Sequence, residues 1–221
     1  MPMKKILLVL ISCFFSAAVL AQATHPYAGD VATIKKYDQM FVPLSHPIVF
    51  VGSSSIRKWQ HLQVAFGSYN VLNRGIGGAV VDDIIYYLND LVFSYNPRQI
   101  VLYVGENDLV NESETADDIL NKTITLYKDI REKLPDVPIV YISLKPSPSR
   151  DKYQEKCIKT NSLIRDFLSK EKNVVFVDIF TPMLKDGKSR PELFVQDMLH
   201  MNPEGYAIWE KKIKHYLIKP E

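Results

Sequence analysis

The chain has 221 residues, 47% of them hydrophobic and 24% charged, which is typical of one globular domain and excludes a disordered or fibrous protein. Its 27 Lys and Arg residues nearly balance 25 Asp and Glu residues, so electrostatics give no reason to expect nucleic acid or an anionic membrane as a partner. The two cysteines are too few for a disulfide scaffold or a cysteine-based zinc site.

The N-terminus has the pattern of an export signal. Lys4-Lys5 precede an apolar run over residues 6–20, and the small residues Ala21 and Ala23 follow it. A basic start, an apolar centre and small residues at the end are typical of a signal peptide. The run is also shorter than the ~20 residues that a membrane span prefers. We therefore expect cleavage after Ala21 or Ala23, export to the periplasm or the medium, and no stable membrane insertion afterwards.

Two alternatives to a cleaved signal remain open. The segment could stay attached as an N-terminal anchor, or Leu10-Ile11-Ser12-Cys13 could act as a lipoprotein cleavage box. We favour Cys13 as a passive member of the apolar run, because apolar Phe14-Phe15 follow where a mature lipoprotein is usually polar. After cleavage only Cys157 remains, and its place on the apolar stripe of a predicted helix indicates a buried thiol.

The rest of the chain alternates strands with helices. Short apolar runs rich in β-branched residues predict buried strands at residues 48–51, 71–72, 99–104, 139–143 and 174–177. Segments with helical spacing separate these runs, among them residues 84–92, whose apolar side chains share one face. Asn202-Pro203 predicts the start of a last helix. The alternation predicts an α/β fold with a parallel sheet covered on both faces. We assign residues 1–21 to the signal, 22–47 to a helical lead-in and 48–221 to one domain.

Polar segments follow the predicted strands, at the carboxyl edge where α/β sheets bind ligands. They are Gly52-Ser53-Ser54-Ser55, Asn73-Arg74-Gly75-Ile76-Gly77-Gly78 and Gly105-Glu106-Asn107-Asp108, with Asp197-Met198-Leu199-His200 before the last helix. Each alone has a common structural explanation, such as a serine helix cap, an Asn-Asp turn or a solvated histidine. The glycine segment is a poor dinucleotide loop, because Val80 stands at the third-glycine position of G-x-G-x-x-G.

Together, these segments contain what acyl transfer from an ester requires. A serine becomes a nucleophile when an adjacent base takes its proton. His200 can be that base if a carboxylate holds its other ring nitrogen, and Asp197 lies three positions away. A backbone N–H beside the serine, a glycine N–H and an asparagine amide could stabilise the negative oxygen of the tetrahedral intermediate.

The order Gly-x-Ser, Gly, Gly-x-Asn-Asp and Asp-x-x-His resembles the SGNH (GDSL-type) esterases and lipases over residues 48–206. Residues 50–55, 73–78 and 197–206 are most similar to the branch that includes the catalytic subunits of platelet-activating-factor acetylhydrolase. The resemblance implies a flavodoxin-like three-layer α/β/α sandwich with five parallel strands. It also implies a catalytic triad of Ser54, Asp197 and His200. The oxyanion hole that it implies is formed by Ser54, Gly78 and Asn107.

Two positions depart from the family pattern. Ser53 replaces the usual Asp of Gly-Asp-Ser, which is not a triad member. The change leaves three adjacent serines, so Ser53 and Ser55 remain alternatives to Ser54 as the nucleophile. Ala79 stands where the platelet-factor branch often has an acidic residue, which leaves the contacts to the substrate open.

The connections are too short to form a lid over a long acyl chain, so we expect an open site for a short acyl group such as acetyl. The substrate would be a small-molecule or glycan ester. A weaker hypothesis places Lys145, Arg150 and Arg74 at the rim of the site, where they would recruit an anionic or sugar-bearing ester. We expect no metal and no cofactor, because the five histidines are scattered without ligand spacing. The sequence does not predict the oligomeric state.

Two other functions are compatible with the sequence. A catalytically idle carbohydrate- or lipid-binding protein on the same fold would keep these residues without turnover, but all five family positions are filled. A nucleotide-dependent enzyme would use the loop Gly75–Gly78, but the third glycine is missing and the export signal argues against it.

Overall fold

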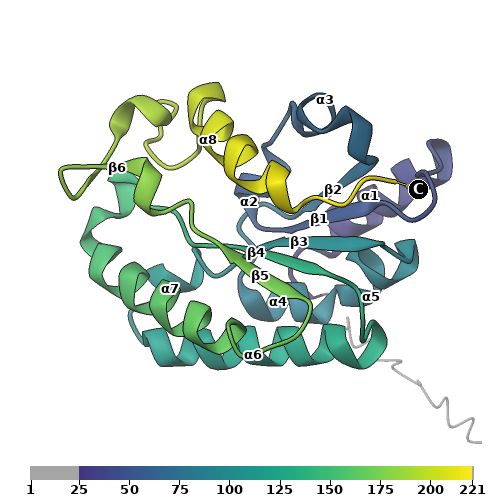
Figure 1. Cartoon of the computed structure of the whole chain (residues 1–221), viewed down its shortest axis with the longest axis horizontal. Helices are drawn as coiled ribbons and strands as arrows, with labels where there is room; N and C mark the ends of the chain where they lie inside the picture. The colour runs from purple at the N-terminus through teal and green to yellow at the C-terminus, as the bar shows by residue number, and fades with distance from the viewer. Residues whose placement is uncertain (1–24, 221) are drawn as a thin grey trace, which may run out of the picture.

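The computed structural model describes residues 25–220, so the predicted signal segment and Cys13 lie outside the described residues. The helices are α1 Ala28–Met40, α2 Ser54–Arg57, α3 Leu62–Ala65, α4 Val81–Tyr86, α5 Leu88–Leu91, α6 Ala116–Lys133, α7 Gln154–Leu168 and α8 Pro203–Ile213. The strands are β1 Ile48–Gly52, β2 Val71–Gly75, β3 Gln99–Tyr103, β4 Ile139–Ile142, β5 Val174–Val177, β6 Leu184–Lys185 and β7 Lys188–Ser189. Figure 1 shows the main sheet between two layers of helices.

The five strands of the main sheet are parallel and lie in the order β2-β1-β3-β4-β5. Ile48 of β1 pairs with Val71 of β2 on one side and with Gln99 of β3 on the other. The chain therefore leaves β1 in one direction and returns to its other side with β3. Sheets of this order bind ligands at that switch point, outside the carboxyl ends of the strands. The predicted flavodoxin-like, three-layer fold is confirmed.

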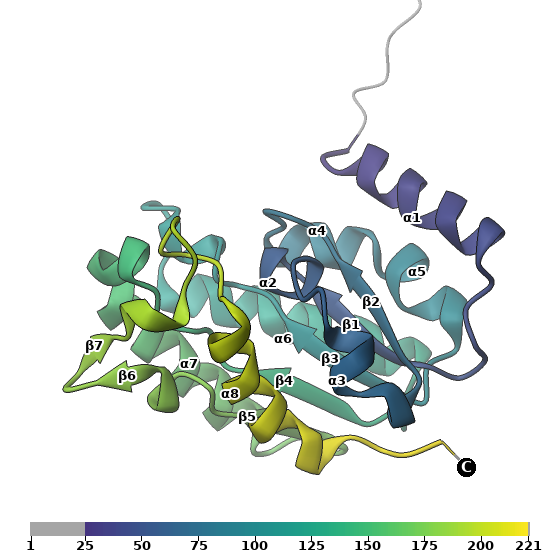
Figure 2. The same ribbon diagram turned by 90° about the horizontal axis from the view of Figure 1, so that it is seen from above.

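Alternate residues of β1 face the two helical layers. Ile48 and Phe50 belong to the core shared with α2, α3 and α8, whereas Val49 and Val51 belong to the core shared with α4 to α7. Strands buried on both faces have no polar face, so their sequences are continuous apolar runs. Figure 2 shows α8 and α3 on the near side of the strands.

Two details differ from, or add to, the predicted elements, and two others agree with the prediction. The single helical face expected over residues 84–92 is divided between α4 and α5, because Tyr87 leaves the helical region with φ −97° and ψ 14°. The short antiparallel pair β6–β7 has no apolar pattern and was not predicted. The last helix begins as expected, since the Asn202 side chain accepts a hydrogen bond from the N–H of Gly205 at 3.0 Å. Cys157 is buried, 3% exposed, as expected.

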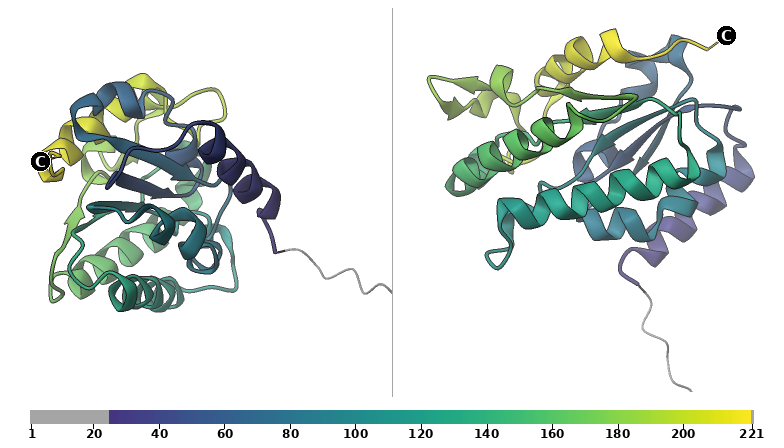
Figure 3. Two further views of the ribbon diagram at one scale, coloured as in Figure 1. Left: turned by 90° about the vertical axis from the view of Figure 1, so that its right-hand side faces the viewer. Right: turned by 60° about the horizontal axis from the view of Figure 1, so that its bottom comes forward.

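Helix α1 lies at one edge of the sandwich (Figure 3). Val31 is its only buried residue. Within residues 25–220, no helix is both long and apolar enough to cross a membrane.

Candidate active site

Ser54 is the first residue of α2, directly after the turn that ends β1. Gly52, the last residue of β1, has a φ of 148°, and a Cβ there would lie 1.9 Å from the carbonyl oxygen of Tyr103, so no other residue fits. Asn73 holds α2 in place, because its Nδ2 donates to the carbonyl of Ile56 at 2.6 Å. The N–H of a first helical residue has no helical acceptor, so the N–H of Ser54 is available to an oxyanion.

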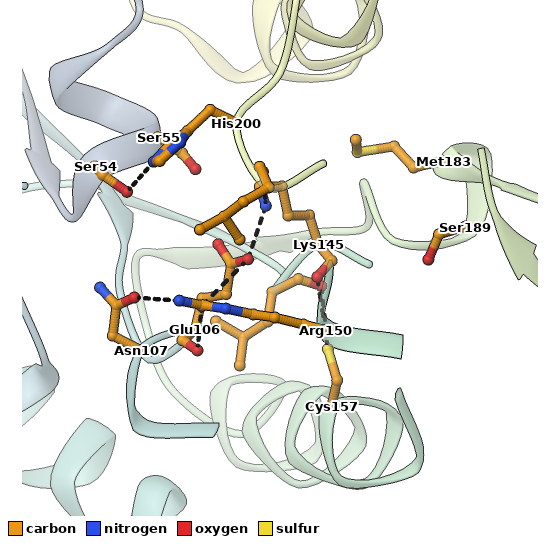
Figure 4. Close-up of polar contacts among 12 residues, drawn as sticks. Ser54, Ser55, Glu106, Asn107, Lys145, Arg150, Cys157, Met183, Ser189 and His200 are labelled. Atoms are coloured by element: carbon orange, nitrogen blue, oxygen red, sulfur yellow. Dashed lines mark hydrogen bonds and ion pairs between the residues drawn. The ribbon is translucent and has the colours of Figure 1, made fainter. Parts of the chain in front are cut away.

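Ser54, His200 and Asp197 form a continuous hydrogen-bonded chain. Ser54 Oγ lies 3.0 Å from His200 Nε2, and His200 Nδ1 lies 2.6 Å from Asp197 Oδ2. Because a carboxylate can only accept, Nδ1 carries the ring proton and Nε2 is free to accept from the serine hydroxyl. Figure 4 shows the contact between Ser54 and His200. The geometry allows His200 to take the serine proton.

The loop before α8 keeps Asp197 charged and in reach of His200. Asp197 Oδ1 accepts the backbone N–H groups of Leu199 and His200, at 2.9 and 2.8 Å. Desolvation favours the neutral form, but the hydrogen bonds from the imidazole and from these backbone groups outweigh it and hold the pKa of Asp197 well below its usual range. Met198 adopts a left-handed φ of 54°, which turns the loop back on itself.

The neighbouring serines differ from Ser54 in their surroundings. Ser53 and Ser55 are each 1% exposed, and within residues 25–220 neither hydroxyl has a hydrogen-bond partner. Of the three adjacent serines, Ser54 alone is placed with its hydroxyl at the histidine.

Asn107 lies against the loop that carries Gly78. Its Nδ2 donates to the carbonyl of Ala79 at 2.9 Å, and its Oδ1 accepts from Arg150 at 2.8 Å. A carbonyl only accepts and a guanidinium only donates, so these two bonds identify the nitrogen end of the amide. The second N–H of Nδ2 remains for a ligand. Gly78 has a φ of 87°, and a Cβ there would lie 3.1 Å from the hydroxyl of Tyr27.

A buried ion pair lies behind these loops. Lys145 Nζ is 2.7 Å from Glu106 Oε1 and donates to the carbonyl of Leu199, also at 2.7 Å. The hydroxyl of Tyr103 donates to Glu106 Oε2 at 2.6 Å. Burial alone would raise the pKa of Glu106, but the charges of Lys145 and Arg150 outweigh it and lower that pKa. The charged pair ties the carboxyl end of β3 to the loop of His200.

The structure overturns part of the cationic-rim hypothesis. The side chain of Lys145 is 0% exposed, and Arg74, which is also buried, is turned away to Asp38 and Tyr95. The hypothesis is wrong in placing Lys145 and Arg74 at the rim of the site. The sequence does not reveal the acidic and phenolic side chains that these two cations contact. Arg150 follows β4 at the carboxyl edge of the sheet, beside the site where the hypothesis placed it, but its contact with Asn107 was not predicted.

A pocket of about 500 Å³ opens beside His200. Its polar lining residues include Lys58, Gln60, His61 and Glu210, and its apolar lining residues include Trp59, Val195, Met201, Pro203 and Tyr206. Sequence reasoning did not identify these residues, since they lie on the segment between α2 and α3, on the loop before α8 and on α8 itself. In the part of the chain that the structure describes, no group of three His, Cys, Asp or Glu residues is arranged to hold a metal ion.

A hydrolase with a serine at the switch point of a flavodoxin-like sheet is the class that this fold and site define. The chain belongs to the GDSL-like lipase/acylhydrolase family, whose model matches residues 49–208, and it is a hydrolase that acts on ester bonds. No curated protein matches its sequence.

Solved structures share the fold. A Streptococcus pneumoniae protein whose name refers to platelet-activating factor is 24% identical with a TM-score of 0.75, over 86% of this chain and 92% of that one. A GDSL-like lipase from Bacteroides thetaiotaomicron is 21% identical with a TM-score of 0.71, over 84% and 97%. A lipase/acylhydrolase from Enterococcus faecalis is 18% identical with a TM-score of 0.63, over 79% and 99%.

Proposed function

We propose that the protein is an exported serine esterase that cleaves short-chain carboxylic esters, with Ser54 as nucleophile, His200 as base and Asp197 as the group that orients His200. The observation that carries the proposal is the unbroken chain from Ser54 Oγ to His200 at 3.0 Å and on to Asp197 at 2.6 Å. Transfer of the serine proton requires this alignment, whereas ligand binding alone does not require it.

The reaction proceeds in two steps on these atoms. His200 Nε2 takes the hydroxyl proton while Ser54 Oγ bonds to the ester carbonyl carbon, and the alcohol then leaves with that proton. Water next gives a proton to His200 and attacks the acyl-serine, which releases the acid and restores the hydroxyl. In both steps the carbonyl oxygen becomes negative, and the donors for it are the N–H groups of Ser54 and Gly78 and the amide of Asn107.

The pocket beside His200 supports a small substrate with a polar alcohol group. Lys58, Gln60, His61 and Glu210 supply hydrogen-bonding groups for that alcohol group, beside apolar surface from Trp59 and Tyr206. Because the connections are too short to form a lid over a long acyl chain, we expect higher kcat/KM for acetyl than for octanoyl and longer esters. A clear preference for the longer chains would overturn this substrate class.

The test of the chemistry is hydrolysis of p-nitrophenyl acetate by the protein and by Ser54→Ala and His200→Ala. Loss of a triad nucleophile or base lowers kcat by on the order of 10⁶ in other serine hydrolases, and we expect a loss of this size. Ser53→Ala and Ser55→Ala are matched controls that should stay active. Activity that survives Ser54→Ala but disappears in a control would move the nucleophile. A protein inert towards short and long esters would favour the binding-protein alternative.

Export rests on the N-terminal pattern alone. N-terminal sequencing of the protein from its native cell should find Gln22 or Thr24 first. An intact Met1 would support an uncleaved anchor, and a lipid-modified Cys13 would support a lipoprotein.

A further inference from the structure

Arg150 makes a two-pronged contact with the carboxyl end of β3. Its NH2 donates to Asn107 Oδ1 at 2.8 Å, and its NH1 donates to the backbone carbonyl of Glu106 at 2.7 Å. Figure 4 shows the guanidinium extending to Asn107, with Glu106 beside it. We propose that Arg150 is a positioning residue of the oxyanion hole, which fixes and polarises the amide of Asn107. The inference rests on the proposed function.

The two contacts determine where the amide of Asn107 points. The planar guanidinium of Arg150 holds both Glu106 and Asn107, so the side chain of Asn107 cannot rotate without losing its hydrogen bond to Arg150. Arg150 takes Oδ1, and the carbonyl of Ala79 takes one hydrogen of Nδ2. A flipped amide would place its oxygen against the oxygen of Ala79 and its nitrogen against a cation. The remaining N–H is therefore held in one direction, and Figure 4 shows the amide nitrogen on the side of Asn107 away from Arg150.

Arg150 also changes the strength of that N–H as a donor. A cation hydrogen-bonded to an amide oxygen draws electrons from the nitrogen, which makes the N–H a better donor. The benefit grows as the bound oxygen becomes negative, so it is larger in the transition state than in the substrate complex. Loss of Arg150 should therefore lower kcat and leave KM nearly unchanged.

The surroundings keep Arg150 in this role. Its side chain is 16% exposed, and the carboxylate of Glu106 lies 3.5 Å from its NH1. Lys145, the other cation at Glu106, is fully buried and donates to Leu199, so it has no contact with Asn107 and does not duplicate Arg150.

The experiment is a double-mutant cycle on p-nitrophenyl acetate hydrolysis. We expect Arg150→Met to lower kcat by about 10- to 100-fold, less than the 10²–10³ of a lost oxyanion donor, and to change KM by less than about twofold. In an Asn107→Ala background the same substitution should lower kcat by less than about threefold, since its target is gone. Arg165→Met is the matched control, at an arginine of α7 whose side chain is 59% exposed, and its kcat and KM should equal those of the parent protein.

A second measurement separates positioning from folding. Arg150→Ala should regain part of its kcat when guanidinium is added at non-denaturing concentration, and methylammonium should restore less, because only guanidinium matches the planar fork. Equal losses with and without Asn107, a loss confined to KM, or no preference for guanidinium would overturn the role of Arg150 while esterase activity stands. Absence of esterase activity in the unmodified protein would overturn the proposed function and this inference with it.

Discussion

At the scale of single residues, Asp108 is a buried carboxylate beside the proposed oxyanion hole. It accepts the N–H of Val81 at 3.2 Å, which connects it to the start of α4 just after Gly78. Lys122 lies 3.7 Å away and is shared with two other carboxylates, those of Asp82 and Glu114. Burial outweighs these contacts and raises the pKa of Asp108 from its ordinary value of 3.8 to about 6.

This raised pKa predicts a specific pH dependence of stability. Between pH 4 and 6 the folded protein holds a proton on Asp108 that the unfolded chain has released, so its free energy of unfolding falls as the pH rises. Asp108→Asn removes this effect and keeps an oxygen for Val81. In urea unfolding, we expect the variant to gain up to about 3 kcal/mol on the parent between pH 4 and pH 7. A stability difference that stays constant over this range would contradict the burial of a titrating Asp108.

At the scale of elements, the segment between β4 and α7 joins the loops of the site. Lys145 at its start contacts Glu106 after β3 and the carbonyl of Leu199 before α8. Both side chains of this ion pair are buried: Lys145 is 0% exposed and Glu106 is 5% exposed. Removal of one member of such a pair leaves an uncompensated charge in the interior, whereas removal of both does not.

We therefore expect Lys145→Met to lower the free energy of unfolding by about 3–5 kcal/mol. Adding Glu106→Gln should recover part of the loss, because the glutamine is neutral and can still accept from Tyr103. Lys152→Met, at a lysine 67% exposed in the same segment, should stay within about 0.5 kcal/mol of the parent. Denaturant unfolding of the three variants measures this, and a double variant less stable than Lys145→Met would refute the buried-charge explanation.

The elements and the site differ in how far the sequence predicts them. Buried parallel strands are local apolar runs, so the strands and the residues directly after them can be located from the sequence. The contact of Arg150 with Asn107 joins positions 43 apart, and that of Lys145 with Glu106 joins positions 39 apart. Such pairs depend on how a loop folds back over the sheet edge, and a lysine in a loop is usually solvated. The break at Tyr87 likewise has no Gly or Pro to mark it.

At the scale of the whole molecule, α1 is attached to the sandwich mainly through its charges. Val31 is its only buried residue, while Lys35 pairs with Asp90 and Asp30 pairs with Arg57 of α2. The side chains of these two pairs are 32–60% exposed, and ion pairs so exposed contribute little and weaken with salt. A less exposed pair is that of Asp38 with Arg74, whose side chains are 21% and 9% exposed, so α1 is held by one apolar side chain and one partly buried ion pair. The central strands, in contrast, are covered on both faces.

Helix α1 should therefore open without unfolding of the sheet. In native-state hydrogen exchange, we expect its amides to exchange through an opening of much lower free energy than those of β1 and β3, and faster still at high salt. Helix α6, which has six buried residues, is the internal control and should exchange with the sheet. Equal protection of α1 and β1 would mean that α1 belongs to the cooperative core. Because the hydroxyl of Tyr27, just before α1, lies close to Gly78, opening of α1 would uncover one side of the proposed oxyanion loop while the proposed triad stays in place.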